Sequence, residues 1–120
     1  MNPLDYCLQK ASEISYVKGQ QRHYAVVTDK RGKIISEGRN SYTKSSPLMQ
    51  KLSMKVGVSE HKCFLHAEIK TILRDKANKG VKLYVARVNA KGEAVNSKPC
   101  RVCEYYIKTK RNIKSIEYTL

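Results

Sequence analysis

Residues 65–88 read LHAEIKTILRDKANKGVKLYVARV, and this stretch determines the architecture because it joins a helix to a strand. Its first half carries apolar residues at helical spacing: Leu65, Ile69, Ile72 and Leu73. Gly80 follows as a helix-ending residue, and the run 81–88 is mostly apolar and indicates a buried strand. A helix that precedes a buried strand predicts a layered α/β sheet.

The segment before this stretch predicts a β-hairpin. Residues 24–28 and 33–37 are rich in strand-forming residues and flank a turn at 29–32 that contains glycine. Gly38 is expected to end the second strand. His23 falls at the start of the first strand, and no motif assigns it a role.

Two further segments lie on either side of this hairpin. An N-terminal helix is expected from Pro3, with Asn2 as its cap and Gly19 as the residue that stops it. Residues 39–62 are polar, and leucine and valine at intervals of four residues indicate a short helix over about 47–55. Segments of this length and polarity often have functional roles.

The C-terminal segments complete the predicted order. Residues 89–98 read as a polar loop, Pro99 opens another helix, and residues 113–119 form a last strand. The order is therefore helix, strand, strand, helix, strand, helix, strand. Interleaved helices and strands predict an α/β fold with a mixed sheet in one domain spanning residues 1–120.

The composition constrains the partners. The chain has 120 residues, 24 Lys plus Arg against 10 Asp plus Glu, and a formal net charge of +14. Such an excess of positive charge in a folded domain favours a polyanion or a phosphorylated ligand, and the alternative is a surface that is simply rich in lysine. No apolar run approaches the length of a membrane span, and the first residues do not resemble a signal peptide. We therefore expect a cytoplasmic protein that does not associate with a membrane.

Two short motifs carry the chemistry: His66-Ala67-Glu68 and Pro99-Cys100-Arg101-Val102-Cys103. In a chain without a secretion signal, C-x-x-C indicates a metal or redox site rather than a disulfide. His66, Cys100 and Cys103 together make three zinc ligands, the number that a catalytic zinc site takes from the protein. Glu68 is then placed to accept a proton from water at the metal and to return it to a substrate nitrogen.

A closed structural zinc site is the main alternative to catalysis. Cys63 or His61 would supply its fourth ligand, completing a tetrahedral set with no room for water. That interpretation leaves Glu68 without a purpose. Cys7 and Cys63 are otherwise expected to be small core residues.

The two motifs match the H-x-E and P-C-x-x-C signature of zinc-dependent nucleobase deaminases, so the chain resembles the cytidine deaminase superfamily. Within it, the sequence is most similar to small phage and bacterial deoxycytidylate deaminase-like proteins. The resemblance implies a three-layer α/β/α cytidine deaminase-like fold, bound Zn²⁺, and hydrolytic deamination catalysed by Glu68. It also implies that the Ala67 backbone N–H contacts the base and that Asn40 contacts the sugar.

The substrate remains open between several alternatives. The high positive charge favours cytosine in single-stranded DNA or RNA, with a free-nucleotide deaminase as the runner-up. A tRNA adenosine deaminase and a non-catalytic zinc-containing nucleic-acid-binding module follow. The candidate nucleic-acid or phosphate contacts are Lys98, Arg101 and Tyr105. Basic residues on either side of the motifs would form an electrostatic funnel, and a homo-oligomer is also expected. These residues are Lys44, Lys51, Lys55, Lys62, Lys108, Lys110, Arg111 and Lys114, together with Lys98 and Arg101.

Overall fold

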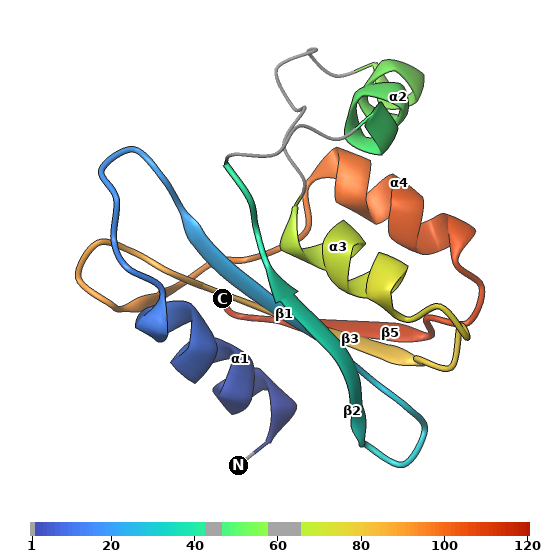
Figure 1. Ribbon diagram of the computed structural model, residues 1–120, viewed down its shortest axis with the longest axis horizontal. Coiled ribbons are helices and arrows are strands. Elements are labelled where there is room, and N and C mark those ends of the chain that lie inside the picture. The colour runs from blue at the N-terminus through green and yellow to red at the C-terminus, as the bar shows by residue number, and fades with distance from the viewer. Residues whose placement is uncertain (1, 43–46, 58–65) are drawn as a thin grey trace.

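A mixed five-stranded sheet forms the centre of the computed structural model, which describes residues 2–42, 47–57 and 66–120 (Figure 1). Its strands are β1 (Arg22–Thr28), β2 (Ile34–Arg39), β3 (Lys82–Val88), β4 (Ala94–Val95) and β5 (Ser115–Tyr118). β2 lies at one edge, followed by β1 and then β3 in antiparallel pairing. The far side of β3 is shared by β4, which pairs antiparallel, and β5, which pairs parallel. This parallel pair is joined by a crossover connection that contains a helix, and it makes the sheet mixed, as the sequence predicted.

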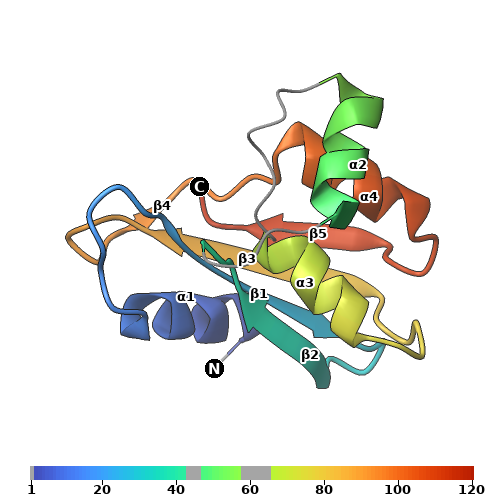
Figure 2. The same cartoon turned by 45° about the horizontal axis from the view of Figure 1, so that its top comes forward.

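Helices cover both faces of the sheet, so the protein has three layers (Figure 2). α1 (Pro3–Glu13) packs on one face, and α3 (Ala67–Arg74) and α4 (Arg101–Thr109) lie on the other. α2 (Pro47–Val56) packs against α4. Alternate strand residues serve the two faces because side chains in a strand point to opposite sides in turn.

The alternation is clear in β1 and β3. On the α3 side the shared core includes residues two apart in each strand: Ala25, Val27, Leu83 and Val85. On the α1 side the intervening residues pack around the buried Cys7: Val26, Tyr84 and Ala86. Cys7 is thus the core residue that the sequence predicted, whereas Cys63 lies outside the described residues.

The N-terminal helix starts where predicted and ends earlier. Asp5 donates its backbone N–H to the Asn2 side chain at 2.9 Å, which is the expected N-cap. The helix stops at Glu13 because the next residue, Ile14, is extended. The prediction that Gly19 stops the helix is wrong; Gly19 lies in a later turn with a φ of +84°.

Three other boundaries differ from the prediction. Gly38 does not end the second strand but lies buried within β2, where a Cβ would be only 3.2 Å from the Thr71 hydroxyl of α3. This close approach of helix and strand favours a residue without a side chain, because a Cβ would push the Thr71 hydroxyl aside by a few tenths of an ångström. The predicted loop 89–98 contains the short strand β4, and the helix expected from Pro99 begins at Arg101. None of the helices in the described part of the chain is long and apolar enough to cross a membrane.

Candidate metal centre and active site

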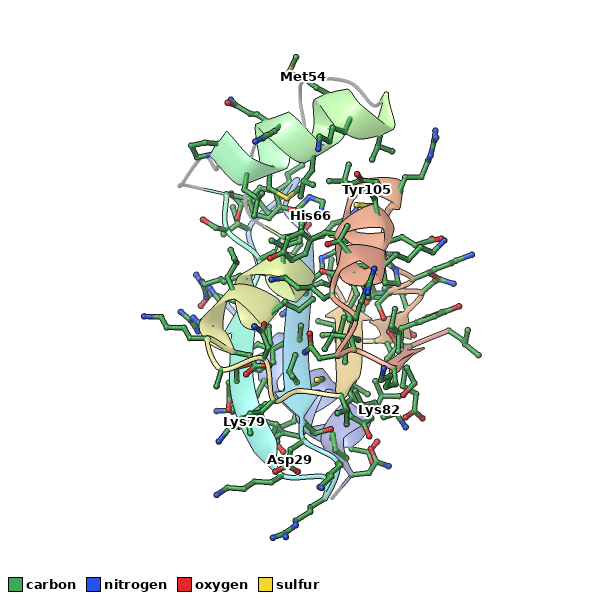
Figure 3. All side chains as sticks on the ribbon, turned by 90° about the vertical axis from the view of Figure 1, so that its right-hand side faces the viewer. Asp29, Met54, His66, Lys79, Lys82 and Tyr105 are labelled. Carbon is green, nitrogen blue, oxygen red and sulfur yellow. The ribbon has the colours of Figure 1, made fainter. Side chains whose placement is uncertain are left out.

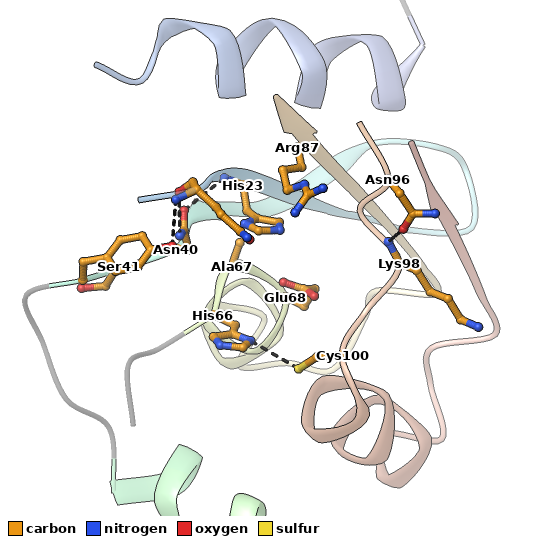
Figure 4. A pocket seen from close by; sticks show the side chains of 12 residues that line it. His23, Asn40, Ser41, His66, Ala67, Glu68, Arg87, Asn96, Lys98 and Cys100 are labelled. Carbon is orange, nitrogen blue, oxygen red and sulfur yellow. Dashed lines mark hydrogen bonds between the residues drawn. The ribbon is translucent and has the colours of Figure 1, made fainter. Parts of the chain in front are cut away.

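The starts of α3 and α4 bring three metal-ligating side chains together. His66 is the N-cap residue of α3, Cys100 is the N-cap residue of α4, and Cys103 lies in the first turn of α4. The His66 Nδ1 atom is 3.2 Å from the Cys103 Sγ atom and 3.5 Å from the Cys100 Sγ atom. The ligand atoms of all three lie within 4.8 Å of one another. Figure 4 shows His66 and Cys100 facing each other across this space.

Backbone contacts hold these residues in place. The carbonyls of His66 and Cys100 accept the first helical hydrogen bonds of α3 and α4, at 3.0 and 2.8 Å. Neither side chain caps its own helix, so both point their ligand atoms to the centre. The buried Ser97 donates its hydroxyl to the Val85 carbonyl at 2.8 Å and anchors the segment that leads to Cys100.

The donor set fits zinc. A tetrahedral zinc with ordinary bond lengths separates an imidazole nitrogen from a thiolate sulfur by roughly 3.6 Å, close to the two distances observed. One nitrogen and two sulfurs are also the donor types that zinc prefers. The described residues could therefore hold a metal ion with the protein supplying three ligands.

The electrostatics of the cysteines favours a ligand role. The hydrogen bond from Cys103, and after it the His66 imidazole, hold the pKa of Cys100 at about 3. The pKa of Cys103 is raised because its thiol hydrogen-bonds to Cys100 and because it is buried. The pair thus carries one thiolate and one proton, and a bound cation would release that remaining proton.

Glu68 lies on the first turn of α3, beside the three ligands, and is only 5% exposed. Burial raises the pKa of its carboxyl, the largest effect on that group. A raised pKa suits a carboxylate that must both take and release a proton near neutral pH. Its position supports a role in proton transfer.

An open cavity of about 430 Å³ leads to this centre. Its lining includes His66, Glu68 and Cys100, so the metal-binding group is accessible from outside. The other described lining residues come from the β1–β2 side and from the segment after β3: Gln21, His23, Asn40, Ser41, Tyr42, Ala67, Arg87, Asn96 and Lys98. Glu68 is the only acidic residue among these described lining residues.

Asn40 lines the cavity, but its side chain is largely used to hold the strands. The Oδ1 atom accepts the backbone N–H of His23 at 3.1 Å, and the Nδ2 atom donates to the Gln21 carbonyl at 3.0 Å. Asn40 therefore joins the ends of β1 and β2 at the cavity wall. One N–H of its amide is left for a sugar, so the predicted sugar contact stays a prediction.

The other predicted contacts fall into two groups. Ala67 and Lys98 line the cavity, and the Lys98 backbone N–H is bound by the Asn96 side chain at 2.9 Å. Arg101 and Tyr105 lie on α4, outside the described lining. Figure 3 shows Tyr105 on the outer part of α4, away from the sheet. The next residue, Tyr106, packs in the core.

Among the described basic residues of the predicted electrostatic funnel, Lys98 alone lines the cavity. Lys51 and Lys55 are exposed on α2 and Lys108 on α4, and none of these lines the cavity as described. Lys44, Lys62 and the alternative ligands His61 and Cys63 lie outside the described residues. The positive charges of the described cavity wall are Arg87 and Lys98.

The sequence analysis missed His23 and Arg87. Both lie two residues from α3-facing core positions, Ala25 in β1 and Val85 in β3, so they share that face. In the run 81–88, Arg87 follows Leu83 and Val85 at intervals of two residues, and this cation in phase with apolar residues was the signal that could have identified it. The Arg87 Nε atom is buried and, among the described residues, has no hydrogen-bond partner.

Comparisons of the chain with models of known protein families and with curated proteins gave no match.

Proposed function

We propose that this protein is a zinc-dependent hydrolytic deaminase that converts cytosine to uracil, within a nucleotide or a single-stranded nucleic acid. One observation carries the proposal: His66, Cys100 and Cys103 converge at the base of an open cavity, next to the buried carboxyl of Glu68. Three ligands and an adjacent proton carrier are the minimum for hydrolysis at such a centre.

The residues have distinct tasks in the proposed reaction. A zinc ion held by His66, Cys100 and Cys103 would supply Lewis-acid activation, lowering the pKa of a water molecule towards ~7. Glu68 accepts a proton from the attacking water and delivers it to the ring nitrogen. It then takes the remaining proton of the added hydroxyl and passes it to the amine, which leaves as ammonia while the C4 carbonyl forms. The Ala67 backbone N–H, at the first position of α3, has no intrahelical acceptor and is offered to the base carbonyl.

Accessibility favours a catalytic over a structural centre. His66 and Cys100 are only partly buried, and both line the cavity. A structural site is normally closed by four protein ligands and excludes solvent. Burial disfavours the charged form of the Glu68 carboxyl and so reduces the stability of the fold. A role in catalysis gives a reason for a carboxyl at this position despite that cost.

A free-nucleotide deaminase is the second candidate, favoured by the cations of the cavity itself. Arg87 and Lys98 line a space of about 430 Å³, the size of a small-molecule site. A guanidinium and an ammonium in one wall would suit a single phosphate group.

The test is a mass-spectrometric assay of the zinc-loaded protein with four substrates in parallel. Deoxycytidine, deoxycytidine monophosphate, a cytosine-containing DNA oligonucleotide and its RNA equivalent are offered at equal cytosine concentration. Conversion of cytosine to uracil in any of them supports the proposal, and the pattern distinguishes polymer from free nucleotide. A zinc-loaded, folded protein that converts none of them would overturn it and favour a binding module.

A further inference from the structure

A second groove adjoins the active-site cavity at the outer edge of the sheet. It encloses about 580 Å³ between the segment that follows α1, the end of β2 and the outer side of α3. β2 is the edge strand, so the groove runs past the edge of the sheet rather than under a helix. It shares four lining residues with the cavity that holds Glu68: Gln21, Asn40, Ser41 and Tyr42. The cavity and the groove therefore lie on two sides of the same four residues.

The described lining of this groove is strongly positive. It contains four cations, Arg22, Arg39, Lys70 and Arg74, and no aspartate or glutamate among the described residues that line it. The two ion pairs among the described residues are Lys82–Glu117 and Lys108–Glu104, so they leave the groove arginines out. The groove thus combines a concave shape with three arginines that form no ion pair with the described residues.

Arg22 is the buried part of this charge. Its guanidinium donates to the carbonyls of Ile14, at 2.9 Å, and Asn89, and both of these acceptors are neutral. Arg39 and Arg74 are exposed, and Arg74 also donates to the Glu37 carbonyl at 2.7 Å. Backbone carbonyls thus orient two of these arginines without neutralising them.

An aromatic ring stands where cavity and groove meet. Tyr42 lines both spaces, and its hydroxyl accepts the Gln21 backbone N–H at 2.9 Å. This bond fixes the ring at the junction. Proteins that bind single-stranded nucleic acid combine basic grooves with such aromatic platforms, because every base has a face that can stack.

We propose that this groove binds the sugar-phosphate backbone of a single-stranded nucleic acid, next to the nucleotide whose base occupies the cavity. Arg39 and Arg74 contact phosphates, Arg22 and Lys70 add to the positive field, and Tyr42 stacks on the neighbouring base. The inference rests on the proposed deaminase function for the position of the reacting base, and it selects the polymer over the free nucleotide as substrate. A single nucleotide would fill the cavity and leave the charge of the groove unused.

The test measures the affinity of the zinc-loaded protein for a fluorescent single-stranded oligonucleotide at increasing salt, without turnover. The groove variant is Arg39→Gln/Arg74→Gln. Its matched control is Lys30→Gln/Arg31→Gln, at the exposed turn beside Asp29, which Figure 3 places at the opposite end of the molecule from His66. Each pair removes two positive charges, taking the net charge from +14 to +12.

We expect the groove variant to weaken binding by about tenfold or more, and its salt dependence to fall by roughly 0.7 per lost phosphate contact. The control should change affinity by less than about twofold, as expected for charges far from the bound strand. Tyr42→Leu should weaken binding by about tenfold, whereas Tyr42→Phe, which keeps the ring but loses the hydroxyl that holds it to Gln21, should bind more tightly than Tyr42→Leu. If the double groove variant fails to fold, Arg39→Glu against Arg31→Glu gives the same comparison at exposed positions.

Equal losses in groove and control variants, or no binding by the wild type, would overturn the inference. The two proposals fail separately because binding is read without chemistry. An inactive protein that binds through the groove contradicts only the deaminase function. An active deaminase whose affinity for the oligonucleotide is unchanged by the groove substitutions contradicts only the proposal that the groove binds nucleic acid.

Discussion

His23 and Arg87 face each other as direct partners across the antiparallel pair β1–β3, and both line the wall of the cavity that leads to the candidate metal centre (Figure 4). Burial, followed by the positive charge of Arg87, lowers the pKa of His23 to about 4. The imidazole is therefore neutral near pH 7, while the guanidinium stays charged. The pair presents one cation and one neutral hydrogen-bonding ring to a ligand beside Glu68.

The low pKa of His23 makes stability depend on pH. The unfolded chain binds a proton on this imidazole below about pH 6.5, whereas the folded protein does so only near pH 4. The contribution of the neutral His23 to the free energy of unfolding is thus fully present above pH 6.5. It is lost as the pH falls towards 4, and the loss is at most about 3 kcal/mol. Urea unfolding of the wild type and of His23→Gln at several pH values between 4 and 7 measures this loss of stability. The variant should lose less stability on acidification, and parallel curves would contradict the prediction.

Removal of one metal ligand should remove the metal. We expect Cys100→Ser to lose zinc and to melt about 10 °C lower or more, because the binding energy of the ion contributes to folding. Cys7→Ala is the matched control, since Cys7 is buried on the opposite face of the sheet, among α1 residues. Metal analysis should find zinc in the control and not in Cys100→Ser. Full occupancy in Cys100→Ser would refute the ligand assignment.

Glu68→Gln separates catalysis from folding. The amide has nearly the same shape but cannot accept the proton, so turnover should fall by about 10²- to 10⁴-fold. Zinc content and melting temperature should be retained, because Glu68 is not one of the three ligands. Glu104→Gln, at an exposed ion pair with Lys108 on α4, should keep full activity. Unchanged turnover in Glu68→Gln would refute the proton-transfer role.

Asn40 should matter for stability as well as for any substrate contact. Asn40→Ala removes the bonds to the His23 N–H and the Gln21 carbonyl at the ends of β1 and β2. We expect a loss of about 0.5–1.5 kcal/mol in the free energy of unfolding, as for hydrogen bonds that are partly exposed to water. Chemical denaturation measures this loss. An unaltered midpoint would show that the two bonds do not stabilise the strand ends.

Much of the fold was predictable because its signals are local. The hairpin followed from strand-forming residues around a glycine turn, and the parallel β3–β5 pair followed from a helix placed between two strands. Boundaries were less predictable. Gly38 signals a strand end by its residue type, yet it lies within β2, where α3 packs closely enough to favour a residue without a side chain.

The sequence by itself determined the chemistry of the centre. His66 and Glu68 share one short motif, and Cys100 and Cys103 share another, each at the start of a helix, so the sequence supplies the ligand types and the carboxyl. The tertiary structure brings the two motifs together, because His66 and Cys100 are 34 residues apart in the chain. Only the tertiary structure decided what surrounds them. The register between β1 and β3 pairs His23 with Arg87, and the packing of α3 beside the β2 edge assembles the basic groove. Both depend on contacts between residues far apart in the chain, which spacing along the sequence does not specify.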